Sequence, residues 1–399
     1  MFATIDELPR DSTVLVRVDL NSPIEDGEVQ DNRRFACHAE TIRVLCDAAH
    51  RVVAIAHQGR PGQPDCTSLD QHARLLSTGY ELPIDHCPET VGKTAREAVR
   101  SLAPGEAVLL ENVRMHPDEL ADRTPAEHAE TDFVAALASL GDAYVGDAYS
   151  VAHRAHASVV GLPLAMDAYA GPVMVDEFRA NAAIQERTFD GPVVMVLGGT
   201  KVPDLLRVIR GVGDRVDTFL LGGVLGELCL RADGYDLGYD VDDGELFDPL
   251  WETHADELAA LVAGESDRIE LPTDLAGPGP DGERVDVDVG TGPKSHPYYD
   301  IGPMTIGRYT DVLADADAAF VKGGLGVFED ERFANGTVSC LRTIAKSGAF
   351  SVVGGGDTAR AIELYELDRT AFDHVSIAGG AYVRALAGES LPGVDALTR

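Results

Sequence analysis

The stretch that decides the fold runs Pro192-Val193-Val194-Met195-Val196-Leu197-Gly198-Gly199-Thr200-Lys201. Its continuous apolar run, opened by proline and closed by two glycines, predicts a fully buried parallel strand. Pro203 and Asp204 then begin an apolar pattern of helical period, so a helix follows the strand at once. Lys201, in a chain with only five lysines, therefore stands at the carboxyl end of a strand, where open α/β sheets bind ligands.

Glycine pairs close four more apolar runs in the second half of the chain. Glycine lets a backbone approach a ligand closely and turns its N–H groups toward that ligand. A single pair often serves tight turn geometry alone, but this repetition at successive strand ends favours a floor for a nucleotide or a phosphate. The pairs are Gly222-Gly223, Gly323-Gly324, Gly354-Gly355-Gly356 and Gly379-Gly380.

Length and charge limit the class of protein. At 399 residues the chain is long enough for two domains, and its 45% hydrophobic content is that of a globular protein. The net charge of −34 excludes nucleic acids and anionic membranes as partners. Because the acidic residues are spread along the chain, we interpret them as adaptation to a salt-rich cytoplasm, where counterions screen repulsion. A merely acidic mesophilic protein is the alternative.

The six cysteines show neither C-x-x-C pairs nor metal-ligand spacing, so they read as reduced thiols of a cytoplasmic protein. The first residues have neither a basic start nor an apolar signal core, and no apolar run approaches membrane-spanning length. We expect a cytoplasmic protein that acts as a monomer.

The first half also alternates strands with helices, which indicates a parallel sheet. The predicted strands are Val14 to Leu20, Arg51 to Ala56, Pro83 to His86, Ala107 to Glu111 and Ala143 to Val145. Cationic side chains gather at their ends and in the adjoining loops: Arg34, His57, Arg60, Arg114, His153, Arg154 and His156. The planar fork of arginine suits phosphate and carboxylate. Each arginine alone could pair with a local carboxylate, but together they predict a phosphorylated carboxylate as substrate.

The stretch from Ala170-Gly171-Pro172 to Arg187 predicts a helix with Pro172 at its start, and this helix is the predicted domain boundary. Beyond it we expect an acidic stretch, several helices and short strands around a Gly/Pro loop. In order these are Asp236 to Asp248 (acidic), Pro249 to Val262 (helix), Arg268 to Leu275 and Arg284 to Val289 (strands), Thr337 to Lys346 (helix, with Thr337 as N-cap and Gly348 past its end), and Asp357 to Leu367 (helix).

Gly354-Gly355-Gly356-Asp357-Thr358-Ala359 matches the G-x-G-x-x-A dinucleotide pattern. The next strand ends in Ala378-Gly379 without the carboxylate that the pattern requires, so nicotinamide binding has weak support. Glycine N–H groups at a helix start still suit a phosphate. Asp357 either caps this helix or holds Mg²⁺ beside the phosphate. Gly290 to Ser295 ends like a P-loop, but Pro293 replaces the required glycine, and we reject it.

A cationic sheet edge and a glycine-rich sheet edge joined by a helix suit two ligands that meet by hinge closure, as phosphoryl transfer requires. In this order, the motifs resemble those of phosphoglycerate kinases nearly end to end. The resemblance is carried by Val16-Arg17-Val18-Asp19-Leu20-Asn21, residues 57–61, Leu110-Glu111-Asn112-Val113-Arg114, Asp147-Ala148-Tyr149, His153-Arg154-Ala155-His156, and residues 197–202, 326–329, 336–337, 354–358 and 391–397.

The resemblance implies reversible, Mg²⁺-dependent transfer of the acyl phosphate of 1,3-bisphosphoglycerate to ADP, which gives 3-phosphoglycerate and ATP. It implies an α/β protein of two Rossmann-like domains, each a parallel sheet flanked by helices. Residues 1–170 bind 3-phosphoglycerate, 171–187 form the interdomain helix and hinge, 188–390 bind the nucleotide, and the tail 391–399 returns to the first domain.

The resemblance also implies roles for individual residues. Asp19, Asn21, Arg34, His57, Arg60, Arg114 and Arg154 bind the phosphoglycerate. Gly198, Gly199, Lys201, Gly222, Gly223, Glu329, Gly354, Gly355, Gly356, Asp357 and Thr358 bind the nucleotide, with Asp357 on Mg²⁺. The catalytic set is Arg34, Lys201, Gly355, Gly356 and Gly379.

The chain departs from the family pattern at three places. Leu205 replaces a second lysine, Val321-Lys322-Gly323-Gly324 replaces Trp-Asn-Gly-Pro, and Ile377-Ala378 replaces Ser-Thr. We hypothesise that Lys322 reaches the nucleotide phosphates and partly replaces the charge missing at Leu205; a solvated loop lysine is the alternative. Two other classes stay open here: a dehydrogenase that uses Gly354–Ala359, and a sugar-acid phosphate binder without turnover.

We predict that folding and activity require salt in the molar range. Self-repulsion of a chain with net charge −34 opposes the compact state unless counterions screen it. The temperature of thermal unfolding should therefore rise steeply with KCl concentration, and far less with a neutral osmolyte. A curve that stays flat down to dilute buffer would refute the adaptation.

Overall fold

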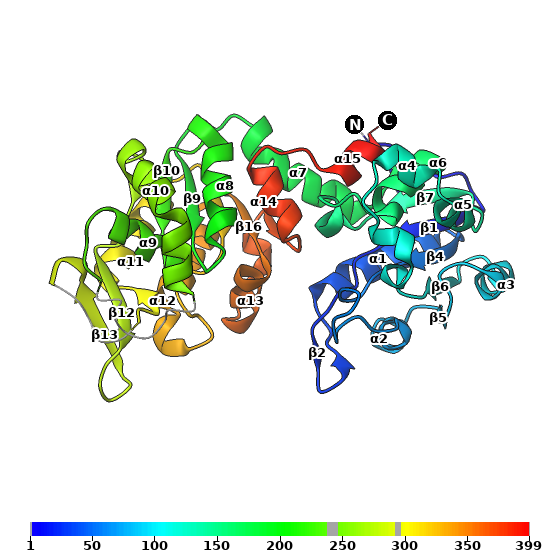
Figure 1. The fold of residues 1–399 in the computed structure, drawn as a ribbon, viewed down its shortest axis with the longest axis horizontal. Coiled ribbons are helices and arrows are strands. Elements are labelled where there is room, and N and C mark those ends of the chain that lie inside the picture. Colours follow the sequence, from blue (N-terminus) through cyan, green and yellow to red (C-terminus); the bar gives the residue numbers. More distant parts are fainter. Residues whose placement is uncertain (1, 238–245, 292–296, 399) are drawn as a thin grey trace. The chain divides into compact units, whose positions relative to one another are not determined.

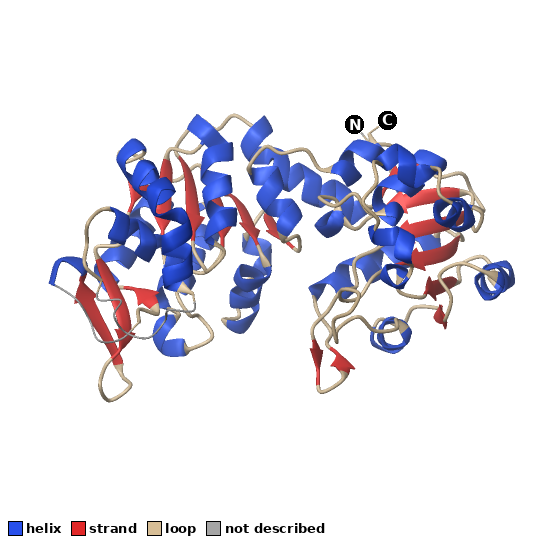
Figure 2. Cartoon of the chain, viewed as in Figure 1, coloured by secondary structure: helices blue, strands red, loops and turns tan. Residues whose placement is uncertain are grey.

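The computed structural model describes residues 2–237, 246–291 and 297–398. The chain divides into two compact units, Met1–Arg179 with Ser390–Arg399, and Ala180–Glu389. Each unit is built on a six-stranded sheet flanked by helices (Figures 1 and 2). The predicted α/β class with two Rossmann-like domains is confirmed.

The sheet of the first unit has the strand order β5-β6-β4-β1-β7-β8, with every pair parallel. All residues of β6 and β7 are buried, which explains why these strands are continuous apolar runs. The strands are β1 (Thr13–Arg17), β4 (Arg51–Ile55), β5 (Ile84–Cys87), β6 (Ala107–Leu110), β7 (Ala143–Gly146) and β8 (Ala168–Ala170), with a hairpin of β2 (Ile24–Glu25) and β3 (Glu28–Val29).

The helices of the first unit cover this sheet. They are α1 (Arg33–Asp47), α2 (Asp70–Gly79), α3 (Lys93–Ser101), α4 (Pro125–Ala129), α5 (Asp132–Ala138), α6 (Leu162–Ala165) and the C-terminal α15 (Pro392–Leu397). The unit boundary falls within α7 (Pro172–Glu186). Asp147, after β7, accepts from the N–H groups of Val173 (2.9 Å) and Met174 (3.4 Å) and so caps the start of α7.

The sheet of the second unit has the parallel order β11-β10-β9-β15-β16-β17. Its strands are β9 (Val193–Leu197), β10 (Thr218–Leu221), β11 (Ile269–Glu270), β15 (Ala318–Lys322), β16 (Phe350–Gly354) and β17 (His374–Ser376). An antiparallel sheet, β13-β12-β14, adds β12 (Asp274–Pro278), β13 (Arg284–Asp288) and β14 (Asp300–Ile301). The helices are α8 (Val202–Val212), α9 (Gly223–Ala232), α10 (Phe247–Gly264), α11 (Pro303–Ala314), α12 (Asn335–Ser347), α13 (Gly356–Leu364) and α14 (Gly380–Leu386).

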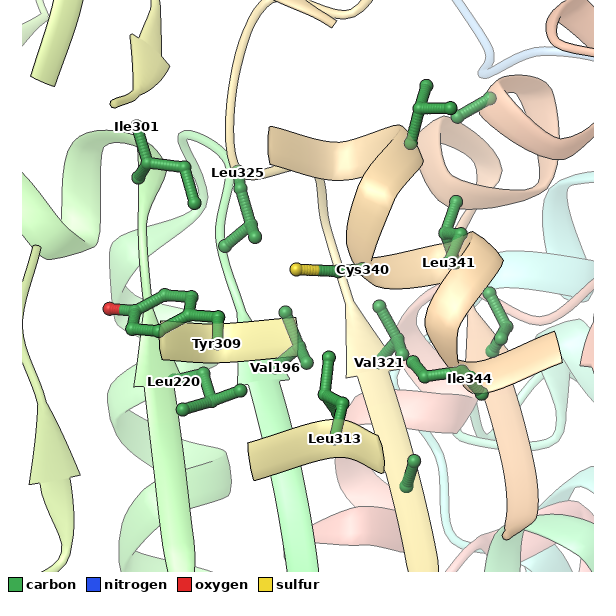
Figure 3. Close-up of a cluster of buried hydrophobic side chains, with 14 of the residues drawn as sticks. Val196, Leu220, Ile301, Tyr309, Leu313, Val321, Leu325, Cys340, Leu341 and Ile344 are labelled. Carbon is green, nitrogen blue, oxygen red and sulfur yellow. The ribbon is translucent and has the colours of Figure 1, made fainter. Parts of the chain in front are cut away.

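A buried apolar cluster holds α11 and α12 against this sheet (Figure 3). Leu313 from α11 and Ile344 from α12 pack toward Val196 and Val321 on the central strands. Tyr309 is fully buried, and its hydroxyl donates to the carbonyls of Leu221 (2.7 Å) and Glu270 (2.6 Å). Because a buried hydroxyl requires a partner, this residue ties α11 to the carboxyl ends of β10 and β11.

The glycines at the ends of β9 and β15 bring two backbones into contact. A Cβ on Gly198 would lie 2.2 Å from the carbonyl oxygen of Gly324, and one on Gly323 would lie 2.1 Å from that of Gly198. Gly323 also has φ +83°, which disfavours any side chain. These glycines serve close packing, whereas Gly356 and Gly379 have open space where a Cβ would stand.

Several predicted element bounds were wrong. The predicted strand Arg268 to Leu275 is two strands in two sheets, β11 and β12, because Pro272 lacks the N–H that would continue the ladder. The regular strand β1 ends at Arg17 and not at Leu20, and β8 was not predicted. The helix α7 does begin at Pro172, as predicted.

Thr337 is not an N-cap, because α12 already begins at Asn335. The Thr337 hydroxyl accepts instead from the Leu325 N–H at 2.9 Å. Gly348 ends this helix with φ 76°, as predicted. Part of the acidic stretch (238–245) and part of the rejected P-loop (292–296) lie outside the described residues.

We predict that Gly198→Ala destabilises the second unit by about 2–3 kcal/mol, because the new Cβ meets backbone that cannot turn aside. Gly356→Ala is the matched control, since nothing lies within 4 Å of a Cβ there. It should change stability by no more than about 0.5 kcal/mol. Urea unfolding at fixed high salt measures both; equal effects would show that close packing is not the reason for Gly198.

Candidate active site

The carboxyl ends of four adjacent strands in the first unit carry the predicted anion-binding residues. In the sheet, β6, β4, β1 and β7 are consecutive and parallel, so the loops that follow them emerge at one edge. Asp19 and Asn21 follow β1, His57 and Arg60 follow β4, Arg114 follows β6, and Arg154 follows β7. The sheet order thus gathers residues that are far apart in the sequence.

Asp19 is a buried carboxylate on this edge, 2% exposed. It pairs with Arg34 Nε at 3.2 Å and accepts hydrogen bonds from the Asn21 N–H (3.0 Å) and the Ser150 hydroxyl. Burial opposes its ionisation, but Arg34 and these donors hold the pKa of Asp19 well below its usual range. Asp19 therefore stays charged and orients Arg34.

Arg34 is placed by the start of α1. The side chain of Asn32 caps this helix by accepting from the Arg34 N–H at 2.8 Å, which fixes Arg34 in the first turn. Arg34 Nη1 donates to the Asn21 carbonyl at 2.9 Å, and the side chain is 30% exposed. Arg34 is thus held by its Asp19 pair and by the Asn21 carbonyl while part of it remains accessible.

Arg114 is a buried cation with donor capacity to spare. Its Nη1 donates to the Gly59 carbonyl at 2.5 Å, whereas its buried Nε has no partner among the described residues. Burial, Arg17 and Arg154 lower the pKa of Arg114 to about 10. Gly59 has φ +63° and donates its N–H to Asn21 Oδ1 at 2.8 Å, so this turn links Arg114 to Asn21.

The arginines on this edge lie close enough to disfavour further positive charge there. Burial lowers the pKa of His156 to about 3, and Arg114, Arg17 and Arg154 add to that effect, so this imidazole is uncharged near neutral pH. The guanidinium of Arg60 is exposed and makes no hydrogen bond or ion pair within the described part of the chain. Because like charges repel at short range, this arrangement is suited to an anion that would bind between them.

Sequence reasoning missed the buried groups that support this edge. Ser150 donates to Asp19, and Glu119, fully buried, accepts from the hydroxyl (2.7 Å) and the N–H (2.9 Å) of Ser158. A serine in a loop and an acidic residue in an acidic chain carry no sequence signal of burial. Arg17 lies within a stretch that carries the family resemblance, but the sequence did not reveal that its side chain is buried.

The carboxyl edge of the second sheet holds two lysines at neighbouring strands. Lys201 precedes α8 and is exposed, whereas Lys322 ends β15 and is 7% exposed. Lys322 lies opposite Leu197 of β9 and Gly354 of β16, and a Cβ on Gly355 would stand 2.9 Å from its Nζ. The alternative of a solvated loop lysine is therefore wrong. Burial and the neighbouring Lys201 lower the pKa of Lys322.

The residues at the start of α13 differ in their accessibility. Gly355 is the N-cap, and no side chain caps this helix, so Asp357 is not a capping residue. Asp357 is exposed in the first turn. Thr358 is fully buried; its hydroxyl accepts from the Gly323 N–H (3.1 Å) and donates to the Gly354 carbonyl (3.2 Å).

A pocket of about 100 Å³ opens among the ends of β9, β10 and β15. Gly199, Gly223 and Gly324 form its glycine wall, and Leu275, Tyr298 and Val327 are among its apolar residues. Asp300 also lines it; this carboxylate binds Arg284 (2.8 Å) and the Gly336 N–H (3.0 Å). A narrow, largely apolar slot beside backbone N–H groups suits a flat ring that carries phosphates.

Three comparisons with known proteins agree. A family model described as phosphoglycerate kinase matches residues 5–389. The phosphoglycerate kinase of Halorubrum lacusprofundi is 56% identical over 397 residues, which cover 99% of this chain and 98% of that protein. That of Haloarcula marismortui is 50% identical over 399 residues and covers 100% of both.

The crystal structure of phosphoglycerate kinase from Pyrococcus horikoshii OT3 superposes with a TM-score of 0.92 at 34% identity, over 100% of this chain and 98% of that one. The chain belongs to the phosphoglycerate kinase family. It is therefore a phosphotransferase of glycolysis that transfers a phosphoryl group between 1,3-bisphosphoglycerate and ADP, as the resemblance implied. Membership of this family decides against the two alternative functions, a dehydrogenase and a sugar-acid phosphate binder without turnover.

Two findings bear on phosphoglycerate kinase chemistry in this chain. Among the described residues, no group of three or more His, Cys, Asp or Glu side chains could hold a metal ion by itself. No helix in the described ranges is both long and apolar enough to cross a bilayer.

Proposed function

We propose that residues 1–170, with the tail 391–399, bind 3-phosphoglycerate or 1,3-bisphosphoglycerate, and that residues 188–390 bind ADP or ATP. The observation that carries the proposal is the Nε of the buried Arg114, unpartnered among the described residues and close to the charges of Arg17 and Arg154 in the first unit, since such a group of cations suits a small, highly charged anion. The proposal includes closure of the two units on each other during turnover, in the cytoplasm, by a monomer. The six free cysteines suit that reducing compartment.

Arg34, Arg60, Arg114 and Arg154 hold the charged groups of the phosphoglycerate in this proposal. The unpartnered Nε of Arg114 and the unpaired guanidinium of Arg60 offer donors in the fork geometry that carboxylate and phosphate accept. His57, Asn21 and Asp19 set the orientation. Asp19 acts mainly through Arg34, with which it is paired at 3.2 Å.

On the nucleotide side, the pocket lined by Gly199, Gly223 and Gly324 takes the adenine ring, with Gly198 and Gly222 behind it. Gly356 and Gly379 have the open space that close approach of a phosphate requires, and Gly354 and Gly355 shape the turn. Glu329, which is exposed, reaches the ribose. Thr358 contributes its backbone N–H, because its hydroxyl is used within the fold.

Lys201 accompanies the phosphoryl group as it moves. It is exposed at the start of α8, where the helix N-terminus also favours negative charge. Phosphoryl transfer requires positioning and charge neutralisation, and it requires no covalent nucleophile. The Lys201 ammonium and the backbone N–H groups of the glycine-rich turns can provide both. Arg34 plays the corresponding part on the side of the phosphoglycerate.

Asp357 fits a Mg²⁺ ion that arrives with the nucleotide. It is an exposed carboxylate in the first turn of α13, and it makes no hydrogen bond or ion pair in the described part of the chain. One carboxylate plus phosphate oxygens is the ligand set that Mg²⁺ uses in kinases. When bound, the ion would neutralise charge on the nucleotide phosphates.

We predict that Arg60→Ala weakens 3-phosphoglycerate binding by roughly 1.5–3 kcal/mol, the loss for a charged hydrogen bond, and leaves ADP binding nearly unchanged. Calorimetric titration of each ligand in high salt measures both. Arg10→Ala, also in the first unit and also exposed, is the control for a change of one charge. An equal loss for ADP would mean that Arg60 is structural and that the assignment of the two sides fails.

We predict that Lys322→Asn, which restores the residue usual in the family, raises the KM for ADP about ten-fold or lowers kcat. The substitution removes the Lys322 ammonium, which lies beside Gly355, from the proposed phosphate site. A charged contact of this kind is worth at least about 1.5 kcal/mol. Lys346→Asn is the control, because Lys346 is exposed in the last turn of α12, near the start of β16. If the kinetics of Lys322→Asn in saturating salt match those of the parent, Lys322 does not replace the charge missing at Leu205.

A further inference from the structure

Arg17 is a buried arginine that touches the site only through another residue. It ends the central strand β1 and is 1% exposed. Its Nη1 donates to the Val18 carbonyl at 2.5 Å, its Nε donates to the Ser158 hydroxyl at 2.8 Å, and its Nη2 lies 3.1 Å from Nδ1 of His57. Arg17 is thus fixed at three points, of which the third is the imidazole of His57.

The contact between Arg17 and His57 is compatible with only one protonation state of the imidazole. A guanidinium carries five N–H donors and no acceptor, so at 3.1 Å the Nδ1 of His57 must supply its lone pair. A neutral imidazole with a lone pair on Nδ1 carries its proton on Nε2. A charged imidazolium would set an N–H on Nδ1 against the N–H of Arg17.

The buried charge of Arg17 is compensated on the side away from His57. The Ser158 hydroxyl accepts from Arg17 Nε and donates to Glu119 Oε1 at 2.7 Å, so the serine bridges the two charges. Glu119 is fully buried. Since Glu119 takes up this side of the guanidinium, Nη2 remains directed at His57.

We propose that Arg17 is a positioning residue that holds His57 neutral, with its proton on Nε2, so that His57 serves phosphoglycerate as a hydrogen-bond donor and not as a cation. This proposal rests on the proposed role of His57 in substrate binding. It distinguishes His57 from the arginines around it. The arginines bind the substrate through positive charge, whereas neutral His57 orients the substrate through one donated hydrogen bond. The affinity for substrate then does not depend on protonation of His57.

The groups that face His57 agree with this assignment. Asp19 lies 3.9 Å from Nε2 and favours a proton there. Arg17 from β1, Arg114 from the turn after β6 and His156 from the segment after β7 oppose a positive charge on the ring. Burial acts in the same direction and is the largest contribution, so the pKa of His57 lies well below its usual value of 6.5.

The direct test is the nitrogen spectrum of His57 in the unmodified protein, assigned with His57→Gln. Two-dimensional ¹H–¹⁵N spectra that report long-range ring couplings distinguish the two tautomers and the imidazolium. We expect an unprotonated Nδ1 and a protonated Nε2 that stay unchanged as the pH falls through 6.5, because the pKa of His57 is lowered well below that ordinary value. A proton on Nδ1, or titration near the ordinary value, would overturn the proposal.

A second test removes the positioning group. Arg17→Met with Glu119→Gln keeps the volume and the buried charge balanced, and thermal unfolding shows whether the variant folds. Without Arg17, no guanidinium N–H faces Nδ1 of His57, so the same nitrogen spectrum should show a proton on Nδ1 in part of the molecules. Affinity for 3-phosphoglycerate should fall accordingly, and adding His57→Gln should abolish this loss, because an amide keeps its N–H whatever faces it. A His57 spectrum identical to that of the parent would mean that Asp19 alone sets the tautomer and would contradict the proposal.

Variants of His57 separate this inference from the proposed function on which it rests. Gln presents an amide N–H near the position of Nε2, so His57→Gln should keep affinity for 3-phosphoglycerate within about three-fold, whereas His57→Leu should lose about ten-fold or more. If His57→Leu binds normally, His57 is not a substrate ligand, even if the spectrum shows the Nε2 tautomer. If the tautomer is wrong while His57→Leu binds poorly, only the role of Arg17 fails.

Discussion

The repulsion among cations at one sheet edge is the constraint on which the first unit depends. The pKa of Arg114 is lowered by Arg17 and Arg154, and that of His156 by all three. In a chain of net charge −34, abundant carboxylates could have neutralised each of these groups. Instead each buried acid described at this edge is bound to a particular group: Asp19 holds Arg34, Glu119 is linked to Arg17 through Ser158, and Asp147 pairs with His38. The remaining positive charge is left for a ligand, and the burial of Arg114 limits screening of its charge by water.

The second unit solves the opposite problem, which is to bring negative charge close to a backbone without side chains in the way. At the ends of β9 and β15, the absence of side chains lets two protein backbones come together, since Gly198, Gly323 and Gly324 pack backbone against backbone. Gly324, which takes part in that contact, also lines the pocket together with Gly199 and Gly223. At α13 and α14, Gly356 and Gly379 leave room for something that is not protein. One residue type thus has two physical roles along a single edge.

Much of this arrangement could be predicted from the sequence, because buried parallel strands are continuous apolar runs and their ends are marked by glycine or by polar residues. The run 192–197 predicted β9 nearly residue by residue, and the cations of the first half were predicted at one edge before the strand order was known. What the sequence could not reveal were contacts set by tertiary packing. Ser150 and Glu119 look like surface residues, and Thr337 resembles a helix cap but binds Leu325. The predicted strand Arg268 to Leu275 is divided between two sheets at Leu271-Pro272.

Leu205 and Lys322 show how such packing limits where a charge can stand. Leu205 is 1% exposed on the inner face of α8, so a lysine there would have to leave the core before it could reach a ligand. Lys322 occupies the end of the neighbouring central strand, where its register against Leu197 and Gly354 directs it to the glycine edge. Gly355 is its structural counterpart, because a Cβ at that position would stand 2.9 Å from Nζ, and its φ of +103° suits glycine alone. A cation at position 322 and the absence of a side chain at 355 therefore belong to one arrangement, and a larger residue at either position would disturb the other.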